Sequence, residues 1–371
     1  MKKSLIALAV LAASGAAMAQ SSVTLYGILD GFLGSSTTEN AVNKTAASVT
    51  QTVLNSGSVN GTRWGMKGTE DLGGGLSTIF DLQSGFGIDT GAAQQSGLLF
   101  GREAFVGLSG GFGTVVFGRV SLPFYDNEGM NDAMLNSSVS AQSNVMRTAN
   151  NWGPNVFDKN ALTGYALRGD NAVRYSTPNM SGFVGTFAYT LNEKTQSIAP
   201  QGNGNGGEIA SASLVYAAGP VSGVLAYQKE TPYQPAGVGA AGTAYAGTNA
   251  SDRSYLRLSG QYDFGMIIAK AGYGRVDNVN FIQDAKTNEY QLGLDYKASA
   301  ALVLSGGIAS SKDDATATIG ELKRTAFTLG GKYVMSKRTF LYGGYESGKQ
   351  TLANSPDAKE SILAFGMQHR F

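Results

Sequence analysis

Apolar and polar residues alternate with a period of two along many segments of this chain, and this period constrains the fold more than any other feature of the sequence. In the segment 287–298, Tyr290 and Leu292 fall on one face of an extended chain, whereas Glu289 and Gln291 fall on the other. The segments 253–262 and 323–334 repeat the pattern, with charged residues opposite the apolar face. This alternation is typical of β-strands that separate two environments. The sequence therefore predicts strands with one apolar and one charged face.

Short turns and long polar connections alternate between these segments. Gly, Pro, Asn and Asp supply the backbone geometry of most of the short turns. The seven turns and eight long loops make fifteen connections, and hence sixteen strands. Because this number is even, both ends of the chain lie at the same end of the barrel, and the first and last strands can pair. The turns are expected at residues 72–75, 110–113, 179–182, 217–220, 263–265, 298–300 and 335–337.

The strand pattern favours a membrane barrel over a soluble sheet. After residue 19 the chain has no run of 18 apolar residues, so we expect no membrane-spanning helix. In a bilayer every backbone polar group must be paired internally, which a closed barrel achieves and an open sheet does not. A barrel of about sixteen strands is too wide for side chains to fill and holds water. Two stacked soluble sandwiches are the alternative; they explain the alternation but not the rhythm of turns and loops or the charged rows.

The first twenty residues predict a secretory signal peptide. Lys2 and Lys3 precede an apolar run that ends in Ala17-Met18-Ala19, so cleavage is expected before Gln20. An uncleaved membrane anchor is the alternative. The mature chain, 20–371, is then a single barrel domain, and it keeps 26 of the 28 basic residues against 27 acidic ones. This near-neutral balance argues against a nucleic-acid partner.

The chain has no cysteine and one histidine, which limits its chemistry. Disulfides and thiolate metal sites are excluded, and an outer-membrane lipase or protease with a histidine base would depend on His369. Alternation places His369 on the lipid-facing side of the last strand, near the rim. We therefore expect no enzyme activity, no metal site and no cofactor, and only a divalent cation bound by a loop stays open.

The final strand explains why the chain ends on an aromatic residue. Leu363, Phe365, Met367 and Phe371 share one face of the last eleven residues. In a barrel this face meets lipid, with Phe371 near the membrane interface.

Several motifs, in this order and spacing, resemble the general porins of Gram-negative bacteria, of the trimeric β-proteobacterial type. They are "SSVTLYGILDG", "GTRWGMKGTEDLGGGLSTIFDLQSGF", "LFGREAFVGLSGGFGTVVFGR", "NAVRYSTPNMSGF" and the closing "HRF". The resemblance implies a sixteen-stranded homotrimer in the outer membrane, with one pore in each subunit. It also implies that the third long loop folds inward and that the outer-membrane assembly machinery reads the terminal aromatic, here Phe371.

The long connection 121–169 holds three acids close together, Asp126, Glu128 and Asp132. Loops of this length without regular structure are usually functional or disordered. The resemblance makes this connection the constriction loop, whereas the residues alone also allow an ordinary exposed acidic loop.

A basic wall is expected to face that loop. Arg63, Arg102 and Arg174 point inward if their neighbours meet lipid, and their positions resemble those of the family's arginine cluster. Arg168 and Arg147 are further candidates. Opposed rows of charge create a transverse field across a narrow waist, which would let small hydrophilic solutes and ions pass, with a mild preference for anions.

The same alternation, with Phe105 taken as outward, places Glu103 outside the barrel. If the turn at 110–113 has the right length, Glu103 faces Arg119 at a subunit interface; otherwise Arg119 joins Arg102 inside the pore. We expect the interface.

Two other kinds of barrel compete with a general diffusion channel. A substrate-specific channel for sugars would need a track of aromatic side chains. Tyr255 and Trp152 are the candidates, but the sequence shows no continuous track. A structural barrel with a plugged lumen would conduct little.

Overall fold

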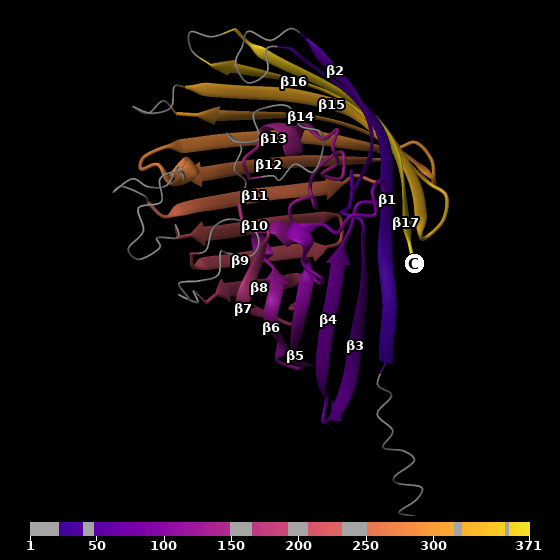
Figure 1. Ribbon diagram of the computed structural model, residues 1–371, viewed down its shortest axis with the longest axis vertical. Helices are drawn as coiled ribbons and strands as arrows, with labels where there is room; N and C mark the ends of the chain where they lie inside the picture. Colours follow the sequence, from indigo (N-terminus) through magenta and orange to yellow (C-terminus); the bar gives the residue numbers. More distant parts are fainter. Residues whose placement is uncertain are drawn as a thin grey trace, which may run out of the picture.

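The computed structural model describes residues 22–39, 48–148, 165–191, 207–231, 251–314, 321–352 and 356–371. The predicted signal peptide and Trp152 lie outside these residues. Nearly all of the described chain outside the loops is β-strand (Figure 1). The strands are β1 Ser22–Glu39, β2 Val49–Ser56, β3 Arg63–Gly73, β4 Leu76–Gly85, β5 Glu103–Gly110, β6 Gly113–Ser121, β7 Arg168–Ser176, β8 Phe183–Thr190, β9 Ile209–Ala218, β10 Val221–Glu230, β11 Arg253–Asp263, β12 Ile267–Asp277, β13 Lys286–Lys297, β14 Leu302–Asp313, β15 Leu322–Val334, β16 Thr339–Leu352 and β17 Ala358–Arg370.

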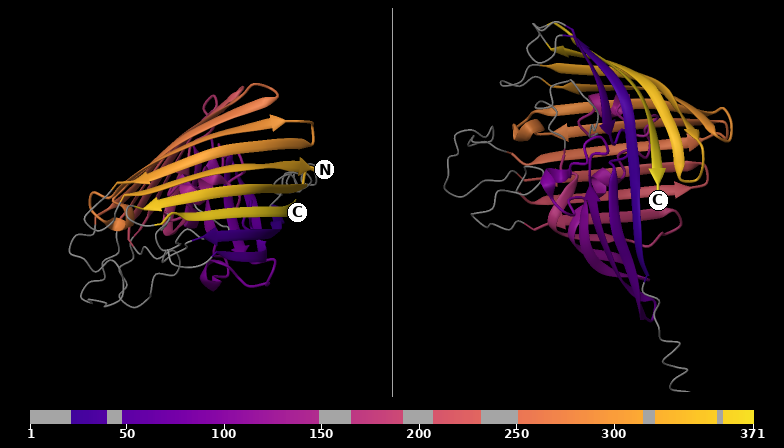
Figure 2. Two further views of the ribbon diagram at one scale, coloured as in Figure 1. Left: turned by 90° about the horizontal axis from the view of Figure 1, so that it is seen from above. Right: turned by 45° about the vertical axis from the view of Figure 1, so that its right-hand side comes forward.

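These strands form one closed antiparallel barrel. Consecutive strands pair from β3 to β17, and β17 pairs with β1 to close the wall. β1 pairs with β3 through residues 22–28 and with β2 through residues 31–38, so β2 and β3 share one position in the wall. The seventeen segments therefore fill sixteen positions, which confirms the predicted number. Two further views show the wall curving round to bring β1 beside β17 (Figure 2).

The break between β2 and β3 is held by Asp30 on the neighbouring strand. The Asp30 carboxylate accepts hydrogen bonds from the backbone N–H groups of Val59 and Asn60, at 3.2 and 3.0 Å. It also accepts one from the Tyr342 hydroxyl at 2.6 Å. These bonds fold the segment between the two strands, so that Asn60 and Gly61 line an internal cavity. The sequence analysis did not foresee this break.

All seven predicted turns join neighbouring strands at one end of the barrel, and the long loops lie at the other. The turn between β3 and β4 contains Gly73, Gly74 and Gly75, each with φ between 63° and 83°. Glycine adopts this left-handed geometry without steric cost. The predicted alternation of short turns and long loops is therefore confirmed.

The two faces of the wall differ as the alternation predicts. Leu292 on β13 and Phe365 on β17 are 59% and 60% exposed on the outside, whereas Glu289 and Arg324 are fully buried on the inside. Leu363, Met367 and Phe371 are also outside, so the predicted lipid-facing side of the last strand is confirmed. Among the described residues, the helices are all too short and polar to cross a membrane.

Candidate constriction of the channel

The connection between β6 and β7 folds into the barrel, where two short helices lie against the wall (Figure 1). Helix α2, Pro123–Asp126, contacts β8, β9 and β10, and helix α3, Ala141–Val145, contacts β14, β15 and β16. Every residue from 137 to 148 is buried. This confirms the inward-folded third loop and rules out an ordinary exposed acidic loop.

Glycines in the wall let this loop lie close to the strands. A Cβ on Gly293 of β13 would lie 2.8 Å from the Cβ of Ala133. A Cβ on Gly344 of β16 would lie 2.8 Å from the Met134 Cε. Both distances are shorter than normal contacts. At Gly293 a larger residue would push the loop into the lumen, because the Ala133 Cβ is fixed to the backbone, whereas at Gly344 the Met134 side chain would have to move.

Side chains of the wall also hold the loop backbone. Lys270 Nζ donates to the Asp132 carbonyl at 2.8 Å, and Arg257 Nη1 donates to the Phe124 carbonyl at 3.0 Å. Phe124 forms an aromatic cluster with Tyr165 and Tyr255, with ring centroids 4.6 to 5.8 Å apart. Tyr255 points inward as predicted, but it packs behind the loop and does not line the passage.

Arg147 is part of another anchor, on β14 and β15. Its Nη2 lies 2.7 Å from Asp313 Oδ2, and Arg324 Nη2 lies 3.3 Å from the same oxygen. The Glu289 carboxylate accepts hydrogen bonds from the backbone N–H groups of Arg147 and Thr148. The expectation that Arg147 belongs to the basic wall is therefore corrected: its charge is used to attach the loop to the barrel.

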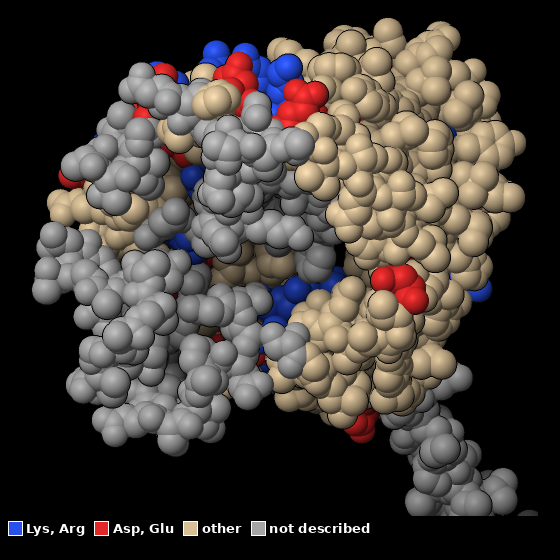
Figure 3. Space-filling view, turned by 45° about the horizontal axis from the view of Figure 1, so that its top comes forward, with Lys and Arg blue, Asp and Glu red and all other residues tan. Residues whose placement is uncertain are grey.

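The loop leaves a cavity of about 620 Å³ between its first half and the strands near the β1–β17 seam. Charged side chains are visible within the hollow of the barrel, whereas most of the outer wall in that view is uncharged (Figure 3). Six charged residues line the cavity: Arg63, Arg102, Lys332 and Arg370 from the wall side, and Asp126 and Glu128 from the loop. Alternation placed Lys332 on the charged face opposite Tyr333, but the sequence analysis did not assign Lys332 or Arg370 to the constriction.

The predicted arginines of β7 complete the same region. Arg174 Nη2 forms an ion pair with Asp126 Oδ2 at 2.7 Å. The Arg168 guanidinium lies 5.3 Å from the centroid of the Tyr125 ring. Burial raises the pKa of the Asp126 carboxyl above its ordinary value, although Arg174 and Arg168 oppose the shift. Arg63, Arg102, Arg168 and Arg174 thus surround the first turn of the loop.

The three loop acids have different surroundings. Asp126 and Glu128 line the cavity. Asp132 instead accepts hydrogen bonds from the backbone N–H groups of Met134 and Asn136 and from the Ser140 hydroxyl, at 3.0, 2.6 and 2.9 Å. Asp132 therefore fixes the shape of the loop and does not face the passage.

The expected pair of Glu103 with Arg119 is not formed. Ser121 donates from its backbone N–H, at 3.1 Å, and from its hydroxyl to the Glu103 carboxylate. Arg119 forms an ion pair with Asp170 and donates to the Gly101 carbonyl at 2.8 Å. The expectation that these two residues face each other at a subunit interface is therefore corrected.

The error comes from the phase of β5. Arg102 precedes the strand, so its inward direction says nothing about alternation within it. Val106 is 53% exposed on the outside, whereas Phe105 packs against buried Val116 on the inside. Gly118, with φ of 136°, lies at an irregularity in the β6–β7 pairing. A bulge of this kind changes which face the following residues occupy.

His369 lies outside this site. Its Nδ1 is 2.9 Å from the Thr339 hydroxyl, at the end of the barrel that carries the short turns. The described residues contain no group of three or more His, Cys, Asp or Glu side chains placed to hold a metal ion.

A closed barrel with an apolar outside, a charged interior and one loop folded into its lumen defines a porin. The chain belongs to the Gram-negative porin family, whose sequence profile matches residues 5–351. Outer membrane porin protein 32 of Delftia acidovorans is 38% identical over 357 residues, covering 92% of this chain and 88% of that protein. An outer membrane porin protein of Bordetella pertussis is 30% identical over an alignment of 419 residues that covers 100% of both chains.

A solved structure supports the same assignment. An anion-selective porin from Comamonas acidovorans has a TM-score of 0.71 and 25% identity, covering 95% of this chain and 100% of that one. The family resemblance drawn from the motifs is therefore confirmed. The protein is a diffusion channel of the bacterial outer membrane, and the alternatives of an enzyme and of a soluble sandwich are set aside.

Proposed function

We propose that this channel passes small hydrophilic solutes and ions with a mild preference for anions. The observation that carries the proposal is the charge around the cavity: four basic side chains against two acidic ones. Arg168 and Arg174 add two further positive charges nearby, and Arg174 pairs with Asp126, one of the two acids already counted. Charged side chains that line a pore bias ion flow through it.

The arrangement of these charges explains why small polar solutes would be favoured. The basic residues lie on the wall and the acids on the loop, so the field runs across the passage. A small dipolar solute can orient in this field, whereas a large apolar solute loses water without compensation. The Comamonas porin described as anion-selective supports the sign of the preference.

A general channel is favoured over a channel for a particular sugar. Tyr255 is covered by the constriction loop, and Tyr125 and Phe340 are the aromatic residues among the described lining of the cavity. Two separated rings do not make a continuous track. Liposome swelling with neutral sugars of rising size tests this point. In a general channel the permeation rate falls smoothly as the size of the sugar increases.

The preference for anions is tested by the reversal potential in a planar bilayer under a KCl gradient. We expect a potential whose sign shows that chloride permeates more readily than potassium. Strong selectivity for potassium would overturn the proposal.

We also propose the assembly that the family resemblance implies: cleavage before Gln20, a homotrimer embedded in outer-membrane lipid, and recognition of Phe371 by the barrel-assembly machinery. The exposed position of Phe371 at the end of the last strand supports the last point. The mass of the mature protein, its migration as a heat-dissociable trimer, and the membrane yield of a variant lacking Phe371 test the three parts.

A further inference from the structure

Two arginines at the constriction are buried with part of their hydrogen-bonding capacity unused. Arg102 is 5% exposed and Arg168 is 4% exposed. Arg102 Nε donates to the neutral Gln83 side chain at 2.7 Å. No described residue accepts a hydrogen bond from Arg102 Nη1, or from Arg168 Nε and Nη2. The two guanidinium groups are close enough to repel each other, and Arg63 also acts on Arg102.

The acids nearby are occupied by other partners. Glu103 and Asp126 both attract Arg168 electrostatically. The Glu103 carboxylate, however, accepts hydrogen bonds from Ser121, and Asp126 forms its ion pair with Arg174. The unused donors therefore keep the capacity to hold an anion, and charge-assisted hydrogen bonds of this kind are roughly twice as strong as neutral ones.

The Tyr125 side chain covers both arginines. The Arg168 guanidinium lies 5.3 Å from the centroid of the Tyr125 ring. A side-chain hydrogen bond joins Arg102 to the Tyr125 hydroxyl. Tyr125 lines the cavity, whereas Arg168 is not part of its described lining. The ring thus stands between Arg168 and the passage, and the hydroxyl takes up part of the donor capacity of Arg102.

The one-turn helix α2 fixes the direction in which Tyr125 points. The preceding Phe124 is fully buried against the wall, and its backbone N–H donates to the Ser211 hydroxyl at 3.1 Å. The Arg257 guanidinium lies 4.3 Å from the centroid of the Phe124 ring. Successive side chains of a helix diverge by about 100°. With Phe124 held by the wall, the next side chain must point into the cavity.

This cover has a consequence for the passage of anions. A conducting pore must bind ions strongly enough to admit them and weakly enough to release them. If Arg102 and Arg168 were open to the cavity together with Arg63, their combined donors would hold a small oxyanion by several charged hydrogen bonds. Such an anion would stay in the constriction and stop the current.

We propose that Tyr125 is a specificity-determining residue that shields Arg102 and Arg168, so that small oxyanions pass the constriction instead of remaining bound there. The ring shields Arg168, and the hydroxyl shields Arg102. The inference rests on the proposed function, because it concerns how anions cross the same cavity.

The test measures how inorganic phosphate blocks the chloride current of single channels at constant pH and ionic strength. Tyr125→Ala uncovers both arginines. We expect the phosphate concentration that halves the current to fall about tenfold, since a hydrogen bond to a charged group contributes on this order to binding. Tyr125→Phe keeps the ring and removes the oxygen, so its value should lie between those of the unmodified protein and Tyr125→Ala. An unchanged value in Tyr125→Phe would refute the role of the hydroxyl.

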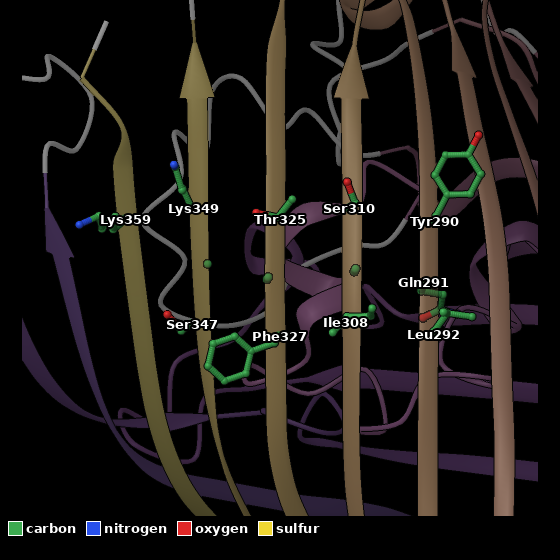
Figure 4. A pocket seen from close by; sticks show the side chains of 13 residues that line it. Tyr290, Gln291, Leu292, Ile308, Ser310, Thr325, Phe327, Ser347, Lys349 and Lys359 are labelled. Carbon is green, nitrogen blue, oxygen red and sulfur yellow. The ribbon is translucent and has the colours of Figure 1, made fainter.

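Two variants control for the loss of an aromatic ring. Phe340→Ala enlarges the same cavity, where the ring lies 5.7 Å from Lys332 Nζ and away from the arginines of the loop. Phe327→Ala removes a ring that is 43% exposed on the outer face of β15, beside a groove outside the wall (Figure 4). Both variants should be blocked by phosphate like the unmodified protein.

A double variant identifies the group that is uncovered. Adding Arg168→Gln to Tyr125→Ala should return the half-blocking phosphate concentration toward that of the unmodified protein. If the double variant is blocked as strongly as Tyr125→Ala, the additional phosphate is not held by Arg168 and the inference fails. The heat-induced gel shift shows that each variant is a folded barrel.

The outcomes separate this inference from the proposed function. Chloride preference in the unmodified protein, with equal phosphate block in Tyr125→Ala and Phe340→Ala, would refute the shielding role and leave the proposed function standing. Weaker phosphate block in Tyr125→Ala would also refute it, because Tyr125 would then help to bind the anion. Strong selectivity of the unmodified protein for potassium would refute both.

Discussion

Arginines that look alike in the sequence have two different roles in this barrel. Arg63 lines the cavity and donates from Nη1 to the Gly61 carbonyl at 3.0 Å. Arg147 and Arg324 share the Asp313 carboxylate behind the loop. A charge that faces the cavity acts on passing ions, whereas a buried paired charge acts on the position of the loop.

Reversing the charge of Arg63 should alter selectivity. Arg63→Glu changes the lining of the cavity from four basic and two acidic side chains to three of each. We expect the reversal potential under a KCl gradient to move toward or past zero. Arg338→Glu, at an exposed turn, is the matched control and should leave the potential unchanged. An unaltered potential in Arg63→Glu would show that this side chain does not act on permeating ions.

Removing the charge of Asp313 should loosen the loop. Asp313→Asn leaves Arg147 and Arg324 without their shared counter-charge, and breaking a buried ion pair costs on the order of 3 kcal/mol. We expect noisier single-channel currents and a lower unfolding temperature. Asp314→Asn, at the adjacent exposed position, should behave like the unmodified protein. Quiet currents in both variants would contradict the anchoring role of Asp313.

At the scale of elements, the constriction depends on a loop that lies flat on a wall of small residues. Gly293 and Gly344 leave room for Ala133 and Met134, and Lys270 and Arg257 hold the loop backbone. These contacts join the loop to the wall behind it, on the side of the loop that faces away from the passage. They therefore set the width of the passage.

A larger residue under the loop should narrow the passage. Gly293→Val places atoms within 2.8 Å of Ala133, so the loop must move toward the opposite wall. We expect a lower single-channel conductance with little change in the sign of selectivity. Gly260→Val on β11, where a Cβ meets nothing closer than 3.4 Å, serves as the control. Equal conductance in the two variants would mean that a larger residue under the loop does not displace it.

The sequence predicted these elements well where the signal was local. Strand alternation and turn residues act between near neighbours, so the sixteen positions and the lipid-facing side of β17 could be read directly. The relation of Glu103 to Arg119 was harder to predict, because Arg102 lies before β5 and gives no strand phase for Glu103, and the Gly118 irregularity interrupts the alternation at Arg119. The role of Asp132 was also hidden, because its partners are backbone groups of a loop whose shape no repeating pattern encodes.

At the scale of the whole molecule, the barrel is closed by a seam in which the C-terminal residue meets β1. The Phe371 backbone N–H donates to the Gly27 carbonyl at 3.1 Å, and the Gly27 N–H donates to the Phe371 carbonyl at 3.2 Å. A Cβ on Gly27 would lie 2.3 Å from the Phe371 ring and 2.7 Å from the Arg63 carbonyl oxygen. The seam thus requires glycine at this position.

Filling the seam should weaken the barrel. Gly27→Leu forces the ring and the backbone apart, and overpacking of this kind costs about 1–3 kcal/mol. We expect a lower temperature for the heat-induced gel shift and slower refolding into detergent. Gly111→Leu, in the turn between β5 and β6 with open space around it, is the control. Identical melting of the two variants would show that the seam tolerates a side chain.

The attachment of the constriction loop has a consequence for biogenesis. The loop is encoded before β7, but the side chains that hold it, among them Lys270, Glu289, Asp313 and Thr328, belong to strands synthesised later. Its final position is therefore available only after the C-terminal half of the wall has formed. Because the wall closes only when β17 pairs with β1, the strands that complete the cylinder are also the ones that position the constriction, so the pore is narrowed as it forms.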